Sequence, residues 1–285
     1  GALITGGAAL EQLSQVQHIA FDKTGTLTVG KPQVTGLYPQ DMSENALLTL
    51  AAAVEQGSTH PLAQAIVREA QSRGLTVPPA TAQRALAGSG IEAEVEGKKV
   101  LIVAADKSPA TGLSPQIQTL EQAGQTVVVV VLEGVVKGML ALRDTLRDDA
   151  KEAVAALHTL GVQGVILTGD NPRAAAAIAG ELGLEFKAGL LPADKVRAVT
   201  ELNAHAPLAM VGDGINDAPA MKASTIGIAM GSGTDVALET ADAALTHNRL
   251  TGLAQMIDLA RATRANIRQN IGIALGLKGI FLVTT

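Results

Sequence analysis

The stretch His18-Ile-Ala-Phe-Asp-Lys-Thr-Gly-Thr-Leu-Thr28 begins with a short apolar run and turns polar at Asp22. The apolar run predicts a buried strand over His18–Phe21, and the glycine and threonines that follow predict a loop at the end of this strand. An aspartate in this place offers a carboxylate nucleophile beside backbone N–H groups that can hold a phosphoryl oxygen. Taken alone, the stretch is also compatible with an Asx turn that closes a strand.

The same pattern of an apolar run that ends in Asp, Thr or Gly occurs three more times. The further predicted strands are Val162–Leu167, Pro207–Val211 and Ile226–Met230. Helical patterns lie between them, and strands that alternate with helices predict an α/β fold with a doubly wound parallel sheet.

Ligands bind beyond the carboxyl ends of the strands in such sheets. The polar residues that follow the predicted strands are therefore expected to converge on one site. These residues are Asp22, Thr168, Asp170, Asp213 and Asp217.

Residues 36–135 separate the first strand from the others, and this stretch is too long for a crossover and about the size of a domain. It has its own predicted helices and strands, at Glu44–Gln56, Pro61–Ser72, Ile91–Val95, Lys99–Val103 and Thr126–Leu132. We therefore predict an inserted α+β domain at 36–135, between two segments of a first domain at 1–35 and 136–249. The chain would cross between the domains near Lys31-Pro32 and near Arg143-Asp144, and the two crossings would form a hinge.

Two further motifs supply a metal site and a cation. In Gly212-Asp-Gly-Ile-Asn-Asp217, Asp213 and Asp217 are hard oxygen ligands suited to Mg²⁺. The alternative is a glycine-rich turn or a calcium-like loop, although the spacing lacks the later acidic ligand of an EF-hand. Pro192-Ala-Asp-Lys195 places a lysine at the start of a predicted helix. Several carboxylates and a phosphoryl group cannot share a site without a metal and a cation. Together the motifs predict phosphoryl transfer through an aspartyl-phosphate intermediate.

Composition excludes several other classes of protein. The 22 Lys and Arg against 27 Asp and Glu give a net charge of −5, and aromatic residues make up 1% of the 285 residues. We therefore expect no nucleic-acid partner, because neither a basic face nor a set of stacking rings is available. The chain has no cysteine, which excludes a disulfide scaffold, a cysteine zinc site and a cysteine nucleophile.

The last fifteen residues, Ile271–Thr285, are apolar except for Lys278. A membrane span needs about 20 apolar residues, so composition leaves open a buried helix or a transmembrane helix cut off by the end of the chain. The preceding stretch, Leu250–Asn270, is predicted to be an amphipathic helix, and its arginines suit the cytoplasmic side of a span. We interpret residues 250–285 as a stalk helix that runs into a truncated transmembrane helix.

The heptapeptide Asp22–Thr28 resembles the phosphorylation motif of P-type ATPases. Three further motifs, Thr168-Gly-Asp170, Pro192-Ala-Asp-Lys195 and Gly212-Asp-Gly-Ile-Asn-Asp217, follow in the order of that family. These are also motifs of the haloacid-dehalogenase superfamily, so the resemblance implies a haloacid-dehalogenase-like fold, ATP as substrate and Mg²⁺ as cofactor. The roles that the resemblance implies are phosphorylation for Asp22, phosphoryl binding for Thr24 and Thr168, charge balance for Lys195, Mg²⁺ binding for Asp22, Asp213 and Asp217, support of the site for Asn216, nucleotide proximity for Asp170, and a hinge for Asp144 with Arg147.

Thr24 separates the ATPases from the phosphatases of this superfamily, which carry an aspartate two residues after the nucleophile as general acid and base. Threonine cannot do this work. The resemblance therefore implies that the phosphoaspartate persists until a glutamate of an actuator domain, elsewhere in the same polypeptide, activates a water. The chain contains no Thr-Gly-Glu motif of that kind.

The inserted domain resembles the nucleotide-binding domain of heavy-metal-transporting P-type ATPases. Ser58-Thr-His-Pro61 is similar to the His-Pro motif of that domain, Gly88 and Gly90 to its glycine pair, and Glu55 to its adenine-contacting glutamate. By this resemblance, Glu55, His60, Gly88 and Gly90 bind ATP. Taken alone, a histidine before a proline is usually a helix cap.

Lys278 points to the cargo, because copper-transporting members have a Tyr-Asn pair at this place. The chain has Leu277-Lys278, which resembles the bacterial zinc, cadmium and lead exporters, where the lysine acts near the transport site. The resemblance implies export of these ions across the bacterial inner membrane. It places the predicted domains on the cytoplasmic side, with the transmembrane domains and the membrane as partners.

Three alternatives remain open: a Cu⁺ exporter, a soluble Mg²⁺-dependent phosphatase, and a regulatory module that binds ATP without being phosphorylated.

Overall fold

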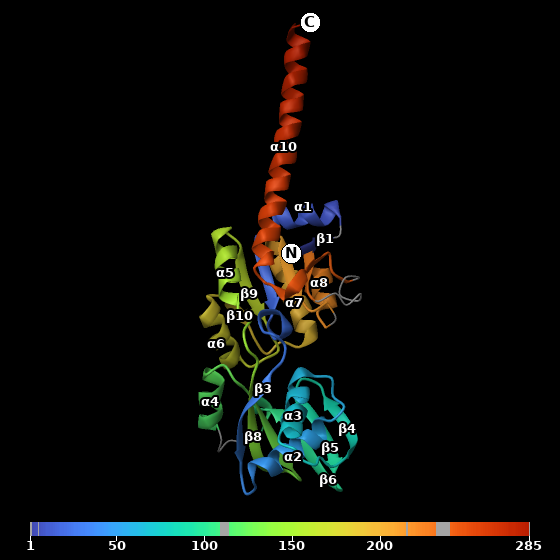
Figure 1. Cartoon of the computed structure of the whole chain (residues 1–285), viewed down its shortest axis with the longest axis vertical. Helices are drawn as coiled ribbons and strands as arrows, with labels where there is room; N and C mark the ends of the chain where they lie inside the picture. The colour runs from blue at the N-terminus through green and yellow to red at the C-terminus, as the bar shows by residue number, and fades with distance from the viewer. Residues whose placement is uncertain (1, 5, 109–113, 215, 232–239, 285) are drawn as a thin grey trace.

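The computed structural model describes residues 2–4, 6–108, 114–214, 216–231 and 240–284. Two units lie one above the other along the long axis, and a long helix extends from the upper one (Figure 1). The upper unit contains Asp22 and holds a seven-stranded sheet, and we call it the phosphorylation domain after its predicted role. The lower unit holds a six-stranded sheet, and we call it the nucleotide-binding unit, likewise after its predicted role.

The sheet of the phosphorylation domain has β2 in its interior. Its order is β1 (Ala2–Ile4), β13 (Ala243–Leu245), β12 (Ile226–Met230), β11 (Leu208–Gly212), β2 (His18–Asp22), β9 (Gln163–Leu167) and β10 (Glu185–Lys187). Neighbouring strands are parallel except for β1 and β13. The chain leaves β2 toward both edges, so the prediction of a doubly wound α/β fold is confirmed.

Each face of this sheet has its own apolar core, because successive side chains of a strand point to opposite faces. Phe21 packs into the core under α1 (Gly7–Gln15), α5 (Ala150–Thr159), α6 (Pro172–Leu182) and the start of α10 (Gly252–Thr284). Its neighbour Ala20 packs into the core under α7 (Pro192–His205) and α8 (Ala218–Ala223). Burial on both faces explains why β2, β9, β11 and β12 read as continuous apolar runs.

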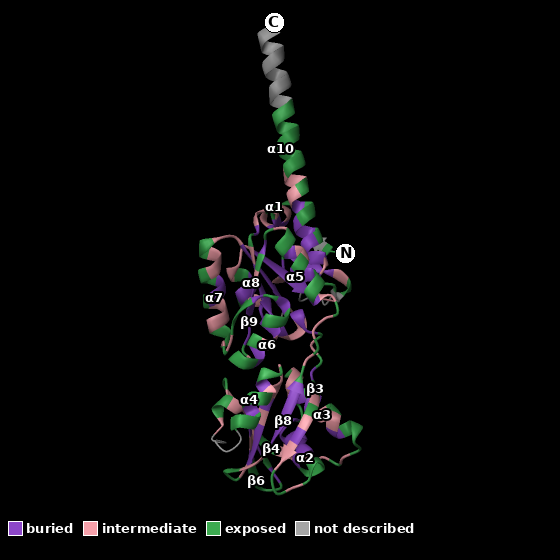
Figure 2. Cartoon of the chain, turned by 90° about the vertical axis from the view of Figure 1, so that its left-hand side faces the viewer, coloured by how far each residue is buried: buried purple, intermediate pink, exposed green. Residues whose placement is uncertain are grey.

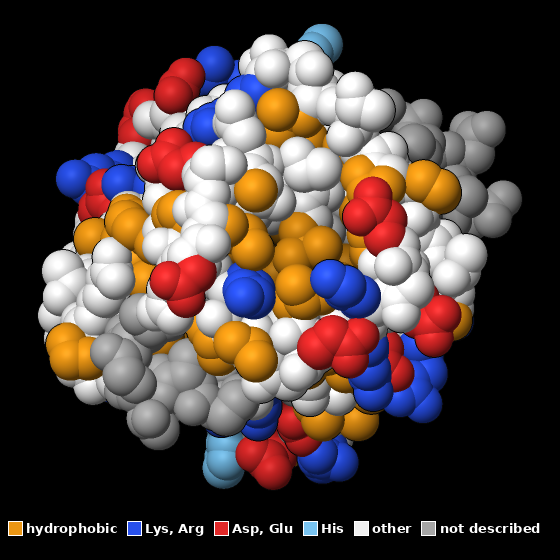
Figure 3. Space-filling view, turned by 90° about the horizontal axis from the view of Figure 1, so that it is seen from below, with side chains coloured by type: hydrophobic (Ala, Val, Ile, Leu, Met, Phe, Trp, Pro, Cys, Tyr) orange, Lys and Arg blue, Asp and Glu red, His pale blue; other side chains and the backbone are white. Residues whose placement is uncertain are grey.

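The nucleotide-binding unit is α+β. Its antiparallel sheet has the order β3 (Gln33–Pro39), β8 (Val135–Arg143), β7 (Thr126–Leu132), β6 (Lys98–Ala104), β5 (Gly90–Val95) and β4 (Ala80–Leu86). The helices α2 (Glu44–Glu55) and α3 (Pro61–Ser72) share one apolar core with it, and α4 (Ser114–Gln122) packs against β7 in another. Acidic and basic side chains are mixed on the far end of this unit (Figure 3).

Two strands carry this sheet beyond the predicted limits of 36 and 135. β3 begins at Gln33 and β8 ends at Arg143, and the two pair with each other. The polar, partly exposed sequence of β3 hides its alternation. The segments that cross between the units run side by side, with the Val29 N–H donating to Thr145 O at 2.9 Å.

In the part of α10 whose side chains the structure describes, residues 252–273, the buried side chains lie at the beginning of the helix (Figure 2). Leu253, Met256 and Ile257 pack in the core of the phosphorylation domain, whereas Ile267 and Ile271 are each 55% exposed. In the part of the chain that the structure describes, no helix is both long and apolar enough to cross a membrane. The membrane assignment of Ile271–Thr285 stays a prediction. Lys278 falls in this helix, and its side chain lies outside what the structure describes.

Candidate active site

Asp22 lies at the carboxyl end of β2, where the chain turns into the loop Lys23–Leu27. The Asp22 carboxylate accepts a hydrogen bond from the Lys23 N–H at 2.9 Å. Gly25 has a φ of 76° inside this loop, a backbone conformation that a side chain disfavours. The loop thus holds the carboxyl group of Asp22 above the end of the sheet.

Lys195 connects Asp22 to the loop after β11. Its Nζ donates to Asp22 Oδ1 at 2.7 Å and to Asp217 Oδ1 at 3.3 Å. The sequence predicts this lysine as the cation of the site, and the structure places it between the two carboxylates. Pro192 begins α7, and the side chain of Asp194 accepts from the Leu191 N–H at 2.9 Å, which fixes the start of the helix that carries Lys195.

The electrostatics of this cluster favour a further cation. Burial, and after it the charge of Asp217, raise the pKa of Asp22 to about 7 although Lys195 opposes the shift. Burial would lower the pKa of Lys195, but the charges of Asp22 and Asp217 outweigh it and raise that pKa. Asp217 Oδ2 is buried and has no hydrogen-bond partner among the described residues. A carboxylate oxygen left in this state is suited to a metal ion.

Two of the three predicted Mg²⁺ ligands, Asp22 and Asp217, lie together, whereas the carboxylate of Asp213 contacts its own loop. Asp213 turns both of its carboxylate oxygens toward Asn216, accepting from the backbone N–H at 2.9 Å and from Nδ2 at 3.1 Å. Among the described residues no group of three or more His, Asp or Glu side chains is arranged to hold a metal ion. Mg²⁺ is commonly held by one or two carboxylates, waters and substrate phosphates, so Asp22 and Asp217 fit this ion.

The two predicted phosphoryl-binding threonines lie on the loops after β2 and β9. Thr168 is buried, and its Oγ1 accepts from the Asp170 N–H at 3.0 Å, which closes the turn after β9. Thr24 is half-buried, with an extended backbone at φ −71° and ψ 123°. The parallel pairing of Asp22 with Leu167 brings the two loops to the same edge of the sheet.

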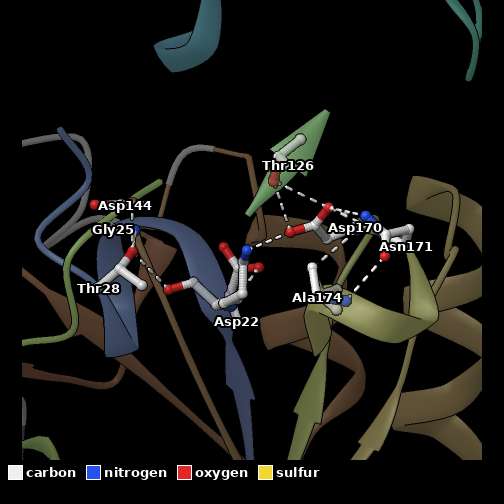
Figure 4. A network of polar contacts seen from close by, with 10 residues as sticks. Asp22, Gly25, Thr28, Thr126, Asp144, Asp170, Asn171 and Ala174 are labelled. Carbon is white, nitrogen blue, oxygen red and sulfur yellow. Dashed lines mark hydrogen bonds and ion pairs between the residues drawn. The ribbon is translucent and has the colours of Figure 1, made fainter. Parts of the chain in front are cut away.

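Asp170 has a partner that the sequence analysis does not predict. Its carboxylate pairs with the ammonium group of Lys23, and it also accepts from the Asn171 N–H at 2.9 Å (Figure 4). Thr126, at the start of β7 in the other unit, contacts both carboxylate oxygens, at 3.2 and 3.1 Å. No local sequence signal identifies these contacts, because they join three segments that are distant in the chain.

The predicted nucleotide residues Glu55 and His60 flank the loop between α2 and α3. Glu55 lines a cavity of about 320 Å³ together with Gly57, Ser58 and Arg68, a volume that admits a nucleobase. Burial raises the pKa of Glu55 to about 7. A protonated Glu55 can donate a hydrogen bond and an ionised one can accept, so both forms are available to a ligand at neutral pH.

His60 is both a helix cap and a candidate ligand. Its Nδ1 accepts from the Leu62 N–H at 3.2 Å at the start of α3. Burial lowers the pKa of His60, which keeps the ring neutral, and the bond at Nδ1 places its proton on Nε2. The capping interpretation of the sequence is therefore correct, and Nε2 can still donate to a nucleotide.

A Cβ at Gly88 or at Gly90 would come too close to another part of the protein, and the neighbour differs between the two positions. A Cβ at Gly90 would lie 1.9 Å from the backbone oxygen of Ile102, so the adjacent strand leaves room only for glycine. A Cβ at Gly88 would lie 2.9 Å from Cδ2 of Leu191, a residue of the phosphorylation domain. The turn that carries both glycines therefore faces the start of α7.

The predicted hinge residues join the two crossing segments next to the Asp22 loop. Asp144 accepts from the Thr28 hydroxyl at 2.5 Å. Arg147 donates from Nε to Thr26 O at 2.7 Å and from Nη2 to Gly25 O at 3.0 Å. The second crossing is thus fastened to the backbone three residues after the nucleophile.

The site thus consists of a strand-end aspartate, a lysine and a second carboxylate on adjacent loops of a doubly wound sheet. The family model for haloacid dehalogenase-like hydrolases matches residues 16–225, and the chain belongs to this family.

Curated relatives extend the comparison over the full chain. The chain is 75% identical over 286 residues to the zinc/cadmium/lead-transporting P-type ATPase of Escherichia coli, covering 100% of this chain and 39% of that protein. It is 43% identical over 290 residues to a probable copper-exporting P-type ATPase V of Mycobacterium tuberculosis, covering 97% of this chain and 37% of that protein. The chain therefore spans about two fifths of the length of these relatives.

Solved structures agree with this family. A zinc-transporting PIB-type ATPase in the E2.Pi state matches with a TM-score of 0.71 and 75% identity, over 100% of this chain and 47% of that one. The catalytic domain of the CPx-ATPase CopB-B matches with a TM-score of 0.74 and 28% identity, over 90% of this chain and 94% of that one. That structure was determined in a study of conformational changes upon nucleotide binding.

Proposed function

We propose that this chain binds ATP and transfers its γ-phosphoryl group to Asp22, within a P-type ATPase that exports zinc, cadmium and lead ions. The observation that carries the first part is the placement of Lys195 Nζ, 2.7 Å from Asp22 and 3.3 Å from Asp217. The similarity of the whole chain to a zinc/cadmium/lead-transporting P-type ATPase supports the second part.

Asp22 is the nucleophile of the transfer. A carboxylate oxygen of Asp22 forms a bond to the γ-phosphorus, and the bond from that phosphorus to the β–γ bridging oxygen breaks, releasing ADP. Lys195 offsets the negative charge that gathers between Asp22, Asp217 and the phosphoryl group. Thr24 and Thr168 offer hydroxyl groups to the phosphoryl oxygens.

The nucleotide-binding unit holds the rest of the substrate. Glu55 and the Nε2–H of His60 bind the adenine, and the turn with Gly88 and Gly90 lets the phosphates pass toward the phosphorylation domain. Asp22 and Asp217, completed by Asp213 and supported by Asn216, would hold Mg²⁺. This ion would supply positive charge that neutralises the phosphates.

The phosphorylated Asp22 is expected to persist in this chain. Thr24 stands where a phosphatase of the same superfamily has its acid and base, and its hydroxyl cannot activate water at neutral pH. Hydrolysis then needs a group from another part of the longer protein, which is the expected role of an actuator domain.

Divalent ions are the favoured cargo. The 75% identity to the zinc/cadmium/lead transporter exceeds the 43% identity to a probable copper exporter, and Lys278 supports the same choice. We place the longer protein in the bacterial inner membrane, with this chain on the cytoplasmic side and Lys278 near the ion path.

The test of phosphorylation uses the 285-residue chain, Mg²⁺ and ATP labelled at the γ-phosphate. We expect an acid-stable, hydroxylamine-sensitive label on Asp22, with slow release of phosphate and no label in Asp22→Asn. Rapid release of phosphate would favour the phosphatase, and a label that survives Asp22→Asn would dismiss Asp22 as the nucleophile.

The cargo is tested in membranes that carry the longer protein, with Asp22→Asn as the blank. We expect Zn²⁺, Cd²⁺ and Pb²⁺ to stimulate ATP hydrolysis. Stimulation by Cu⁺ and Ag⁺ alone would leave the ATPase proposal standing and overturn the choice of ion.

A further inference from the structure

The two units meet beside the active site through Glu121, Thr126 and Arg173, which belong to none of the predicted motifs, and through the predicted site residue Asp170. The helix α4 and the start of β7 lie against α6 and the loop before it (Figures 1 and 4). Thr126 Oγ1 lies 3.2 and 3.1 Å from the two carboxylate oxygens of Asp170, so its single proton can be donated to either oxygen.

A buried carboxylate strengthens this contact. The Glu121 side chain on α4 is only 3% exposed, and its Oε2 accepts from Arg173 Nη1 on α6 at 3.0 Å. A buried charge needs a partner, and here the partner comes from the other unit. Beside it, a Cβ built at Gly124 would lie 3.7 Å from the Cβ of Ala177, so the turn after α4 reaches α6 closely.

The contact ends one residue from the nucleophile. Asp170, which receives Thr126, also pairs with the ammonium group of Lys23. The backbone N–H of Lys23 in turn donates to Asp22 Oδ1 at 2.9 Å. A shift of the nucleotide-binding unit at this contact would therefore move the loop that holds the Asp22 carboxylate.

We propose that Glu121, Thr126 and Arg173 form a docking contact that positions the nucleotide-binding unit for phosphoryl transfer from ATP to Asp22. The inference rests on the proposed function. The three are positioning residues, because they act through the placement of one unit on the other. A displacement of about 1 Å in a bound substrate can reduce a rate by about 100-fold, so a weak contact can have a large effect on transfer.

Thr126→Val tests the proposal with the least change in shape, because it replaces the hydroxyl group with a methyl group. We expect the initial rate of Asp22 labelling at saturating ATP to fall roughly 3- to 10-fold, as for the loss of one hydrogen bond. Arg173→Gln is expected to reduce it at least as much. Binding of ADP should change less than twofold, because the pocket is built on α2 and α3.

Two variants serve as matched controls. Thr126→Ser keeps the hydroxyl group and should restore most of the rate. Thr119→Val removes a hydroxyl from α4 whose bond goes to Pro115 O in the same helix, at 3.0 Å, and should leave the rate unchanged.

A second phosphate donor separates docking from damage at the nucleophile. With acetyl phosphate, the Asp22 oxygen bonds to phosphorus and the phosphorus bond to the acetyl oxygen breaks, releasing acetate. This donor needs no nucleotide-binding unit, so Thr126→Val should react with it as the unaltered chain does. An equal loss with both donors, or no loss with ATP, would overturn the docking role. An unaltered chain labelled by acetyl phosphate but not by ATP would instead overturn the proposed function.

A distance measurement tests the contact without any donor. The chain has no cysteine, so spin labels on Glu94→Cys and Lys151→Cys report one distance between the units. We expect a narrow distribution in the parent and the Thr126→Ser chain, and a broad one in Thr126→Val and Arg173→Gln. Equal distributions in all four would contradict the proposal.

Discussion

Lys195 decides whether two carboxylates can share the active site. Without its ammonium group, the buried Asp22 and Asp217 would face each other, and the pKa of Asp22 would rise further above about 7. We predict that Lys195→Met lowers the rate of Asp22 labelling from ATP by about 100-fold or more, the effect of losing one group that stabilises developing charge. Lys222→Met, on an exposed position of α8, is the control. If Lys195→Met lowered the labelling rate by less than tenfold, another group would have to balance the charge of the two carboxylates.

Glu55 gives the fold a dependence on pH. Burial raises its pKa from an ordinary value of 4.5 to about 7, so the fold prefers the protonated form. The stabilisation is complete below pH 4.5 and is lost as the pH rises through 7. We predict that the free energy of unfolding of the parent, relative to Glu55→Gln, falls by about 2 to 3 kcal/mol between pH 5 and pH 8. Urea denaturation of both chains measures it, and parallel pH curves would contradict it.

In the hairpin of β5 and β6, Gly90 is needed for the pairing of the two strands. A Cβ there would lie 1.9 Å from a backbone oxygen, so the strands must separate, whereas a Cβ at Gly97, in the turn of the same hairpin, meets no atom within 4 Å. We predict that Gly90→Ala destabilises the nucleotide-binding unit by about 3 kcal/mol or more, and Gly97→Ala by about 1 kcal/mol. If urea denaturation gave equal losses of stability for Gly90→Ala and Gly97→Ala, Gly90 would have no special role in the sheet, and only its predicted role in nucleotide binding would remain.

The elements that the sequence predicts well are those buried on two sides or capped by distinctive residues. The strands β2, β9, β11 and β12 appear within about a residue of their predicted limits, because burial on both faces demands a continuous apolar run. α3 begins and ends as predicted, since His60 and Pro61 mark its start. The strand β4 escapes prediction because it is largely exposed, and β3 escapes it because a polar, partly exposed sequence leaves no clear alternation.

The site follows the same division. Strand-end chemistry brings Asp22, Lys195 and Asp217 together as expected, because parallel strands end at one edge. The pairing of Asp170 with Lys23 and Thr126 could not be predicted, because Thr126 arrives from the inserted unit. Its position depends on how the two units dock, and no local pattern in the sequence encodes that arrangement.

At the scale of the whole molecule, arginine side chains of α10 hold the helix to the phosphorylation domain in addition to its apolar face, with Arg264 Nη1 3.5 Å from Ser14 Oγ on α1 and Arg261 in closer contacts. Arg261 Nη1 donates to Leu160 O at 2.7 Å and Nη2 donates to Val16 O at 3.3 Å. Leu160 and Val16 are the C-cap residues of α5 and α1, so both carbonyl groups lie at helix ends where the helix dipole favours a positive charge. One guanidinium group therefore ties three helices together.

We predict that Arg261→Gln lowers the free energy of unfolding by about 2 kcal/mol, because hydrogen bonds from a charged group contribute more to stability than bonds between neutral groups. Arg268→Gln, on the exposed part of the same helix, should cost less than about 0.5 kcal/mol. Hydrogen exchange locates the effect: amides of the first turns of α10 should exchange faster in Arg261→Gln alone. If both variants exchange alike, the apolar face that includes Leu253 and Ile257 is enough to hold α10, and movements of the phosphorylation domain would reach this helix through packing instead of through Arg261.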